Sequence, residues 1–219
     1  MDENKVIPLL PLRGMLVFPG MIINLDVGRD RSIKAVESAM AVDRKILLVT
    51  QREAGTIEPN ESDLFTYGVI AEIKQLLKLP NGALRILVEG LSRAKIENVR
   101  DNKDIYFEAE VQGVASIIDD NNEVGGIKRL LIEPFGQWIL ASKKITSEVL
   151  LTFKDQPDPG RIADMIAGYL TIGIDEKESV LEAINVKDRM NLLYSFLCKE
   201  LEIANIEKNI SQQVRKQIE

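Results

Sequence analysis

The chain has 219 residues, of which 45% are hydrophobic and 28% charged, and its formal net charge at pH 7 is −6. These values are typical of a soluble globular protein with one large domain or two small ones, and the acidic balance argues against nucleic-acid binding as the main role. The sequence contains no histidine, which excludes Ser-His-Asp and Cys-His catalysis and His-ligated zinc within it. The one cysteine, Cys198, excludes an internal disulfide and fits a reducing compartment; it falls on an apolar helical face, so we expect it to be buried.

Residues 7–21, IPLLPLRGMLVFPGM, form an apolar stretch near the N-terminus. Three prolines and the pair Arg13 and Gly14 interrupt it, so it supports neither the helix of a signal peptide nor a membrane span. We instead expect a strand over residues 6–10, a turn at Arg13 and Gly14, and a hydrophobic loop over residues 17–20. No later segment offers a better membrane-spanning candidate.

The rest of the first half has the period-two pattern of β-strands, with strands expected at 45–51 and 105–114. Between them, residues 67–99 predict a hairpin whose turn is the Leu-Pro-Asn-Gly at 79–82, because proline presets the turn and glycine accepts a positive φ. One helix interrupts the strands. Asp30 is its expected N-cap, and Ile33, Val36, Ala39 and Met40 follow at helical spacing.

Near residues 116–127 the pattern changes to the helical period, which predicts a boundary between two lobes. Ile127, Leu131, Phe135 and Trp138 share one helical face, although Pro134 is expected to break or kink that helix. Helix starts are expected where polar residues stand at capping positions: Asp158 before Pro159, Asp175 with Glu178 as a capping box, and Asn185.

The last predicted helix begins at Val186 and has no glycine or proline before the end of the sequence. Its apolar stripe continues to the penultimate position without the usual cap signal. The stripe consists of Leu192, Phe196, Ile203, Ile206, Ile210, Val214 and Ile218. Its last turns therefore indicate a partner outside these residues, either a further domain or another subunit.

The motifs of common enzymes are not found in the sequence. There is no G-x-x-x-x-G-K-[ST] phosphate loop, no G-x-G-x-x-G after a strand, and no C-x-x-C, H-E-x-x-H or G-x-S-x-G. We therefore predict no catalytic residue, no metal ligand and no cofactor in this chain, and interpret it as a binding or assembly module.

The sequence resembles the N-terminal domain of bacterial Lon ATP-dependent proteases across essentially all of its length. The resemblance rests on an ordered series of patterns: P-L-R, F-P-x-M, V-G-R-x-x-S and L-P-N-G-x-x-R-x-L-V-E-G, followed by DPGRIADMIAGYL and EKESVLEAINVKDRMNLL. Pro134 departs from the family, whose corresponding helix is usually free of proline.

The resemblance implies the N-terminal part of a cytoplasmic machine that degrades misfolded and regulatory proteins. Family members cleave with a Ser–Lys dyad, use ATP and Mg²⁺, and assemble as hexamers, and their ATPase and protease domains lie C-terminal to this region. The expected fold is α+β: a mostly antiparallel, partly closed β-lobe with one helix (residues 1–116), a helical lobe (117–185), and a long helix (186–219) that leads toward an ATPase domain.

Two surfaces are candidate contact sites. The first would bind unfolded or degron-bearing protein substrates, because unfolded chains differ from native ones in exposed apolar groups. Its candidate residues are Val17, Phe18, Pro19, Met21, Leu76, Leu77 and Leu79. For each of them, packing in the core is the alternative. The second would mediate self-association, to a dimer of this chain and a hexamer of the longer protein. Its candidate residues are Ile203, Ile206, Ile210, Val214 and Ile218. Two other functions stay open: a stand-alone Lon-domain adaptor without enzyme activity, and a β-domain that binds a small molecule or nucleic acid.

Overall fold

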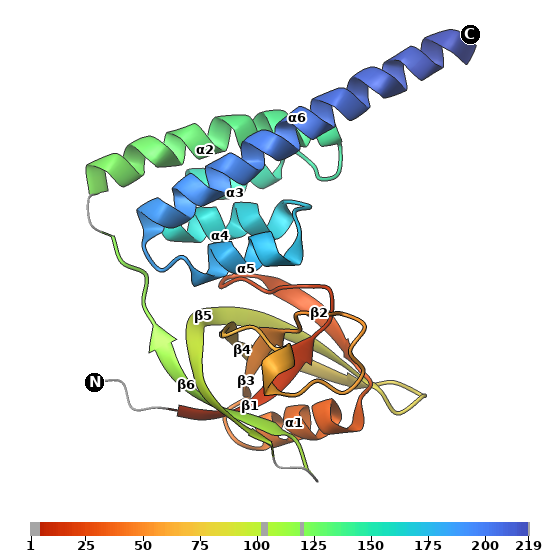
Figure 1. Cartoon of the computed structure of the whole chain (residues 1–219), viewed down its shortest axis with the longest axis vertical. Helices are drawn as coiled ribbons and strands as arrows, with labels where there is room; N and C mark the ends of the chain where they lie inside the picture. The colour runs from red at the N-terminus through yellow and green to blue at the C-terminus, as the bar shows by residue number, and fades with distance from the viewer. Residues whose placement is uncertain (1–4, 102–104, 119–120, 219) are drawn as a thin grey trace. The chain divides into compact units, whose positions relative to one another are not determined.

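A computed structural model describes residues 5–101, 105–118 and 121–218 (Figure 1). The contacts divide the chain into two compact units. The first holds the β-strands, up to Ala115, together with Lys177–Glu182, and the second holds the remaining helices, from Ser116 to Glu176 and from Ala183 onward. The described chain is α+β, as the sequence predicted.

Apart from Lys177–Glu182, the described residues of the first unit form a mixed sheet with one α-helix and one short 3-10 helix. Its elements are β1 (Lys5–Leu12), β2 (Ile22–Val27), α1 (Asp30–Ala41), β3 (Lys45–Thr50), η1 (Glu61–Asp63), β4 (Tyr67–Lys78), β5 (Leu84–Asp101) and β6 (Phe107–Val114). The strand order is β2-β5-β4-β3-β1-β6, and β5 also pairs with β6. Only β1 and β3 are parallel among the described strand pairs.

The long strand β5 closes this sheet on itself. Its first part pairs with β2, from Leu84 to Glu89, and its last part pairs with β6, from Arg93 to Asp101. Register shifts interrupt its ladders, and such bulges bend a strand enough to serve two neighbours. The predicted partly closed, mostly antiparallel lobe is therefore confirmed, with closure at the β5–β6 end.

The β4–β5 hairpin turns where the sequence predicted. Gly82 has a φ of +85°, which glycine accepts without steric cost. The amide of Leu79 donates to the carbonyl of Ala83 at 2.8 Å, and the side-chain oxygen of Asn81 accepts from the amide of Ala83 at 3.1 Å. Local turn chemistry thus fixes the register of the hairpin.

Helix α1 begins one residue earlier than expected. Arg29 is the N-cap and makes no side-chain capping bond, while Asp30 is the first helical residue, where a negative charge interacts favourably with the helix dipole. The buried face consists of Ser32, Ala35, Val36 and Ala39, so the stripe expected from Ile33 and Met40 is rotated slightly. These two larger side chains are partly buried against the same core.

The second unit is helical. Its elements are α2 (Asn121–Ser142), α3 (Val149–Lys154), α4 (Pro159–Tyr169), α5 (Ile174–Glu182, whose last six residues belong to the first unit) and α6 (Val186–Ile218). The predicted caps at Asp158 and Asn185 are confirmed, since Asp158 accepts from the amide of Gly160 at 2.8 Å and Asn185 from that of Lys187 at 3.0 Å.

The capping box expected at Asp175 and Glu178 was wrong. Gly173 is the N-cap of α5, and the carboxylate of Glu176 accepts from the Gly173 amide at 2.9 Å. The helix therefore starts two residues earlier, and Glu178 is buried instead of capping. Cys198, expected to be buried, is exposed on α6.

Helix α2 continues through Pro134, so the break that the sequence allowed does not occur. Proline removes one backbone hydrogen bond, but the apolar face next to it is buried on both sides. Leu131, Phe135 and Trp138 are all buried, and the ring of Phe135 lies 5.8 Å from that of Trp138 and 5.6 Å from that of Phe153. Burial of this aromatic cluster offsets the lost bond.

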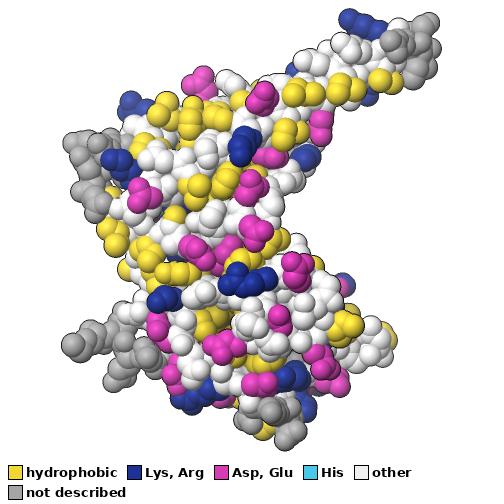
Figure 2. Space-filling view, in the orientation of Figure 1, with side chains coloured by type: hydrophobic (Ala, Val, Ile, Leu, Met, Phe, Trp, Pro, Cys, Tyr) yellow, Lys and Arg dark blue, Asp and Glu magenta, His cyan; other side chains and the backbone are white. Residues whose placement is uncertain are grey.

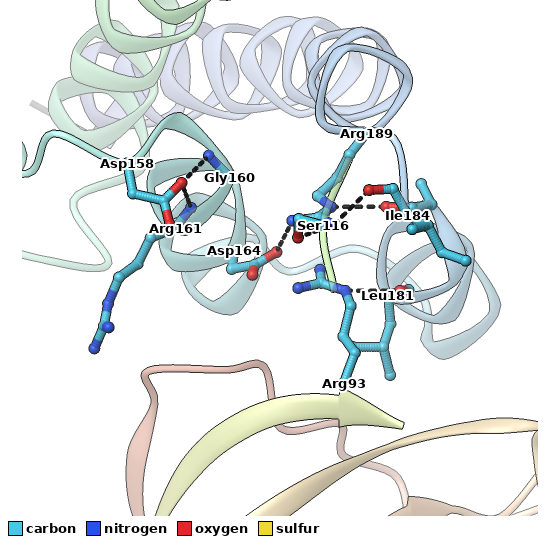
Figure 3. A network of polar contacts seen from close by, with 10 residues as sticks. Arg93, Ser116, Asp158, Gly160, Arg161, Asp164, Leu181, Ile184 and Arg189 are labelled. Atoms are coloured by element: carbon cyan, nitrogen blue, oxygen red, sulfur yellow. Dashed lines mark hydrogen bonds and ion pairs between the residues drawn. The ribbon is translucent and has the colours of Figure 1, made fainter. Parts of the chain in front are cut away.

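Arg189 of α6 is fully buried and anchors the start of that helix (Figure 3). Its guanidinium donates to the carbonyl of Ala183 at 2.8 Å and to the hydroxyl of Ser116 at 3.0 Å, and it lies 3.5 Å from the buried carboxylate of Asp164. A buried charge needs such partners, because leaving it unpaired is costly. The cluster ties the chain before α2, helix α4 and helix α6 together.

Candidate functional site

The N-terminal loop supplies core residues. Val17 is 2% exposed and Phe18 0%, so the packing alternative holds for both in this structure. Pro19 and Met21 are half-buried, and Met21 packs against the main core cluster. The backbone amide of Phe18 also contacts the sulfur of Met21 at 3.2 Å. An exposed apolar surface therefore has to be sought elsewhere.

The tip of the β4–β5 hairpin does expose an apolar side chain. Leu77 is 59% exposed, whereas Leu76, on the opposite face of the strand, packs against the core. Leu79, the first residue after β4, is half-buried and stands two positions after Leu77 at the start of the turn. We call Leu77 and Leu79 the hairpin-tip face.

The apolar stripe of α6 is also exposed in its last turns. Ile203, Ile206, Ile210 and Val214 are 49–54% exposed, and Figure 2 shows hydrophobic side chains in a row along the part of α6 that extends beyond the other helices of its unit. The side chain of Ile218 lies outside the described part of the structure. The earlier stripe residue Phe196 is half-buried within the unit.

A third feature, which the sequence did not predict, is a groove between β1 and β2. Two adjoining hollows of about 370 and 410 Å³ share the four lining residues Pro11, Gly28, Arg29 and Ser32. We call them together the β1/β2 groove. Three of these four residues belong to the V-G-R-x-x-S stretch. This stretch was the sequence signal for the groove. The pairing of the strands had to be known, however, before its residues could be placed beside Pro11 of β1.

Positive charge gathers in this groove. The Arg29 guanidinium donates to the carbonyl of Pro11 at 2.7 Å and to the side-chain oxygen of Gln51 at 2.8 Å. It shares the carbonyl of Ile57, at 3.3 Å, with Arg13, which donates to it at 3.0 Å. Burial, and then the nearby charge of Arg13, lowers the pKa of Arg29 below its ordinary value.

The described residues contain no group of three or more His, Cys, Asp or Glu side chains that could hold a metal ion. Within the same residues, no helix is both long and apolar enough to cross a bilayer. What the geometry offers is a set of surfaces for contact with other molecules: the hairpin-tip face, the exposed stripe of α6 and the β1/β2 groove.

A partly closed β-lobe, followed by a helical unit that ends in a long exposed helix, defines the chain as a two-unit α+β protein with surfaces open to partners. Residues 6–199 match the family described as the ATP-dependent protease La (LON) substrate-binding domain. The chain belongs to this family, as its sequence patterns predicted.

Curated relatives give the same result. The chain is 48% identical over 218 residues to the Lon protease of Desulforamulus reducens and 43% identical over 218 residues to that of Escherichia coli K12. Both alignments cover 100% of the chain but only 27% and 28% of the relative, so the chain spans little more than a quarter of their length.

Solved structures show the same fold at low sequence identity. The N-terminal domain of the Mycobacterium avium complex Lon protease has a TM-score of 0.70 and 22% identity, over 89% of this chain and 98% of that one. The Lon N-terminal domain protein of Xanthomonas campestris has a TM-score of 0.63 and 19% identity, over 87% and 98%.

Proposed function

We propose that this chain recognises protein substrates for a Lon-type ATP-dependent protease and helps that protease to assemble. The observation that carries the proposal is an exposed leucine, Leu77, near the tip of a hydrogen-bonded hairpin in a member of a substrate-binding family. The ligands are unfolded proteins and proteins with an exposed degradation signal, since these present apolar side chains that native proteins bury.

The hairpin-tip face suits this task physically. Leu77 projects from a ladder that pairs it with Arg85, and the turn next to it is fixed by the bonds around Asn81 and Gly82. Because the backbone that carries Leu77 is already ordered, covering this side chain costs side-chain entropy but no ordering of the main chain. Pro19 and Met21, both half-buried, remain secondary candidates.

The proposal is tested with Leu77→Asp and a reduced, carboxymethylated protein as the unfolded ligand. Removing the burial of one leucine, worth about 1.5 kcal/mol, weakens binding about tenfold. The matched control is Val42→Asp, because Val42 is 82% exposed and lies at the end of α1. Equal affinity of wild type and Leu77→Asp, with unchanged stability, would refute the assignment of the hairpin.

The exposed stripe of α6 supports self-association as the second half of the proposal. A row of isoleucines on a helix is stabilised when a like row covers it, as in a coiled coil. We propose a dimer for this chain and a hexamer for the longer protease. The functional division we propose is a β-lobe over 1–116, a helical lobe over 117–185 and the connecting helix over 186–219.

The remaining properties are proposals about the longer protein. From the resemblance to the Lon family, we propose that ATP and Mg²⁺ act in parts of the protease beyond this chain, that peptide cleavage there uses a Ser–Lys dyad, and that the protease works in the cytoplasm. None of these steps is assigned to residues of this chain.

A further inference from the structure

Strands β1 and β2 leave a gap in the barrel between their free edges. β1 pairs with β3 through Leu9–Leu12, but β6 covers its other side only from Lys5 to Pro8. β2 pairs with β5 and, within the described residues, with no other strand. The smaller hollow of the β1/β2 groove lies between these two edges, since it is lined by residues 10–12 of β1 and 24–27 of β2.

On the side that faces this gap, the backbone N–H and C=O groups of β2 have no strand partner among the described residues. The amide of Gly90 donates to the carbonyl of Met21 at 2.9 Å, so Met21 opposite Gly90 is a hydrogen-bonded position of the β2–β5 ladder. Backbone groups alternate along an antiparallel pair, so those of Ile23 and Leu25 also face β5. The N–H and C=O groups of Asn24 and Asp26 therefore face the groove.

At the β1 edge of the groove, the side chain of Arg29 takes the hydrogen-bonding place that a neighbouring strand would fill. Its guanidinium binds the carbonyl of Pro11, and Pro11 itself has no amide hydrogen to offer. The edge of β1 is thus already satisfied at this point, and the open edge of β2 is the one that can accept a further strand.

The positive charges of Arg13 and Arg29 favour a carboxylate on any segment that binds in the groove. Arg13 and Arg29 converge on one neutral carbonyl oxygen, that of Ile57, and neither forms an ion pair with a carboxylate of the described residues. Asp26, on the β2 wall of the groove, is already paired with Arg85, whose Nε lies 2.6 Å from its carboxylate. Asp30 and Glu58 line the neighbouring hollow, where Arg31 is already paired with Asp101, so that end is less favourable to an anion.

We propose that the β1/β2 groove binds an extended polypeptide segment as an added strand along β2, with an acidic side chain of that segment placed against Arg13 and Arg29. This inference rests on the proposed function, because it names how a substrate segment is held. Main-chain pairing is independent of side-chain identity, which suits a protein that takes many unfolded sequences. The acidic residue adds charge-assisted bonds and fixes the register.

The probe is a fluorescent eight-residue peptide of alternating valine and threonine with one central glutamate, titrated against the whole chain. Three changes are each expected to weaken its binding about tenfold: methylation of alternate peptide amides, glutamine in place of the peptide glutamate, and Arg13→Gln in the protein. The matched control is Arg100→Gln, an exposed arginine on the last part of β5, which is expected to leave the affinity unchanged.

A second readout is the amide spectrum of the protein, in which the signals of Asn24 and Asp26 are expected to shift on peptide binding. Failure of the peptide to bind, or equal binding of the methylated peptide, overturns the proposal. Equal binding by Arg13→Gln overturns the acidic register. The hairpin-tip face and the groove have separate tests: Leu77→Asp with the carboxymethylated protein tests the first, and Arg13→Gln with this peptide tests the second, so failure of one is distinguishable from failure of the other.

Discussion

Gly90 lies directly against the backbone of Phe18: a Cβ atom built on Gly90 would be 2.5 Å from the carbonyl oxygen of Phe18. The amide of Gly20 also donates to the carbonyl of Gly90 at 2.7 Å. The backbone of the N-terminal loop therefore packs directly against β5, and this contact helps to keep Phe18 buried.

Replacing Gly90 with alanine is expected to destabilise the chain by about 1–3 kcal/mol, because the loop or the strand must shift to admit a methyl group. Urea unfolding measures the change. Gly113→Ala is the control, since nothing lies within 4 Å of the added Cβ there. Equal stability of the two variants would show that the loop yields freely and is not fixed by this contact.

Arg189→Met is expected to cost about 3–5 kcal/mol of stability, since it removes the bonds to Ala183 and Ser116 and leaves the carboxylate of Asp164 buried without its cation. Thermal or urea unfolding is the measurement. Arg161→Met, on the exposed side of α4, is expected to change stability by less than about 0.5 kcal/mol. A small effect of Arg189→Met would mean that the cluster relaxes around the loss.

The double variant Ile206→Asp and Ile210→Asp is expected to abolish self-association without unfolding the chain, because both side chains are about half exposed on α6. Sedimentation equilibrium at micromolar concentration compares it with wild type, and Asn205→Asp serves as a control on another face of the helix. A monomeric wild type under these conditions would contradict the dimer proposed for this chain.

Asp26 contributes to stability in a pH-dependent way. Its hydrogen bond to Arg85 is the main cause that lowers its pKa below the ordinary value of 3.8. A lowered carboxylate pKa stabilises the fold above pH 3.8, and this contribution is lost as the pH falls through the folded-state value. The effect is small, because the pair is exposed.

The measurement is the difference in urea midpoint between wild type and Asp26→Asn from pH 7 to pH 2.5. We expect a constant difference above about pH 5 that shrinks below pH 4. A difference that persists unchanged at pH 2.5 would assign the effect of the substitution to something other than the charge of Asp26.

Features encoded by local chemistry were predicted from the sequence. The hairpin turn around Asn81 and Gly82, the caps at Asp158 and Asn185, and the extent of α6 each depend on a few adjacent residues. The shift in the α1 start and the unbroken α2 were not predicted, because packing outweighed local preference: Phe135 and Trp138 hold α2 together across Pro134.

The candidate site was only partly predictable for the same reason. Val17 and Leu77 are equally apolar in the sequence, and only the tertiary structure buries one and exposes the other. The β1/β2 groove depends on which strand edges stay unpaired, which is a property of the sheet order. The long-range pairing that brings Arg13 and Arg29 to one carbonyl has no signature in sequence spacing.

The central claim is that the hairpin tip contacts unfolded polypeptide, and amide chemical-shift mapping of the labelled chain with a reduced, carboxymethylated protein tests it most directly. We predict that signals from Gln75 to Ala83 move on titration, while those of the aromatic cluster around Phe135 stay fixed. Shifts that leave the hairpin untouched, or no shifts at ligand concentrations where binding is seen by other means, would contradict the claim.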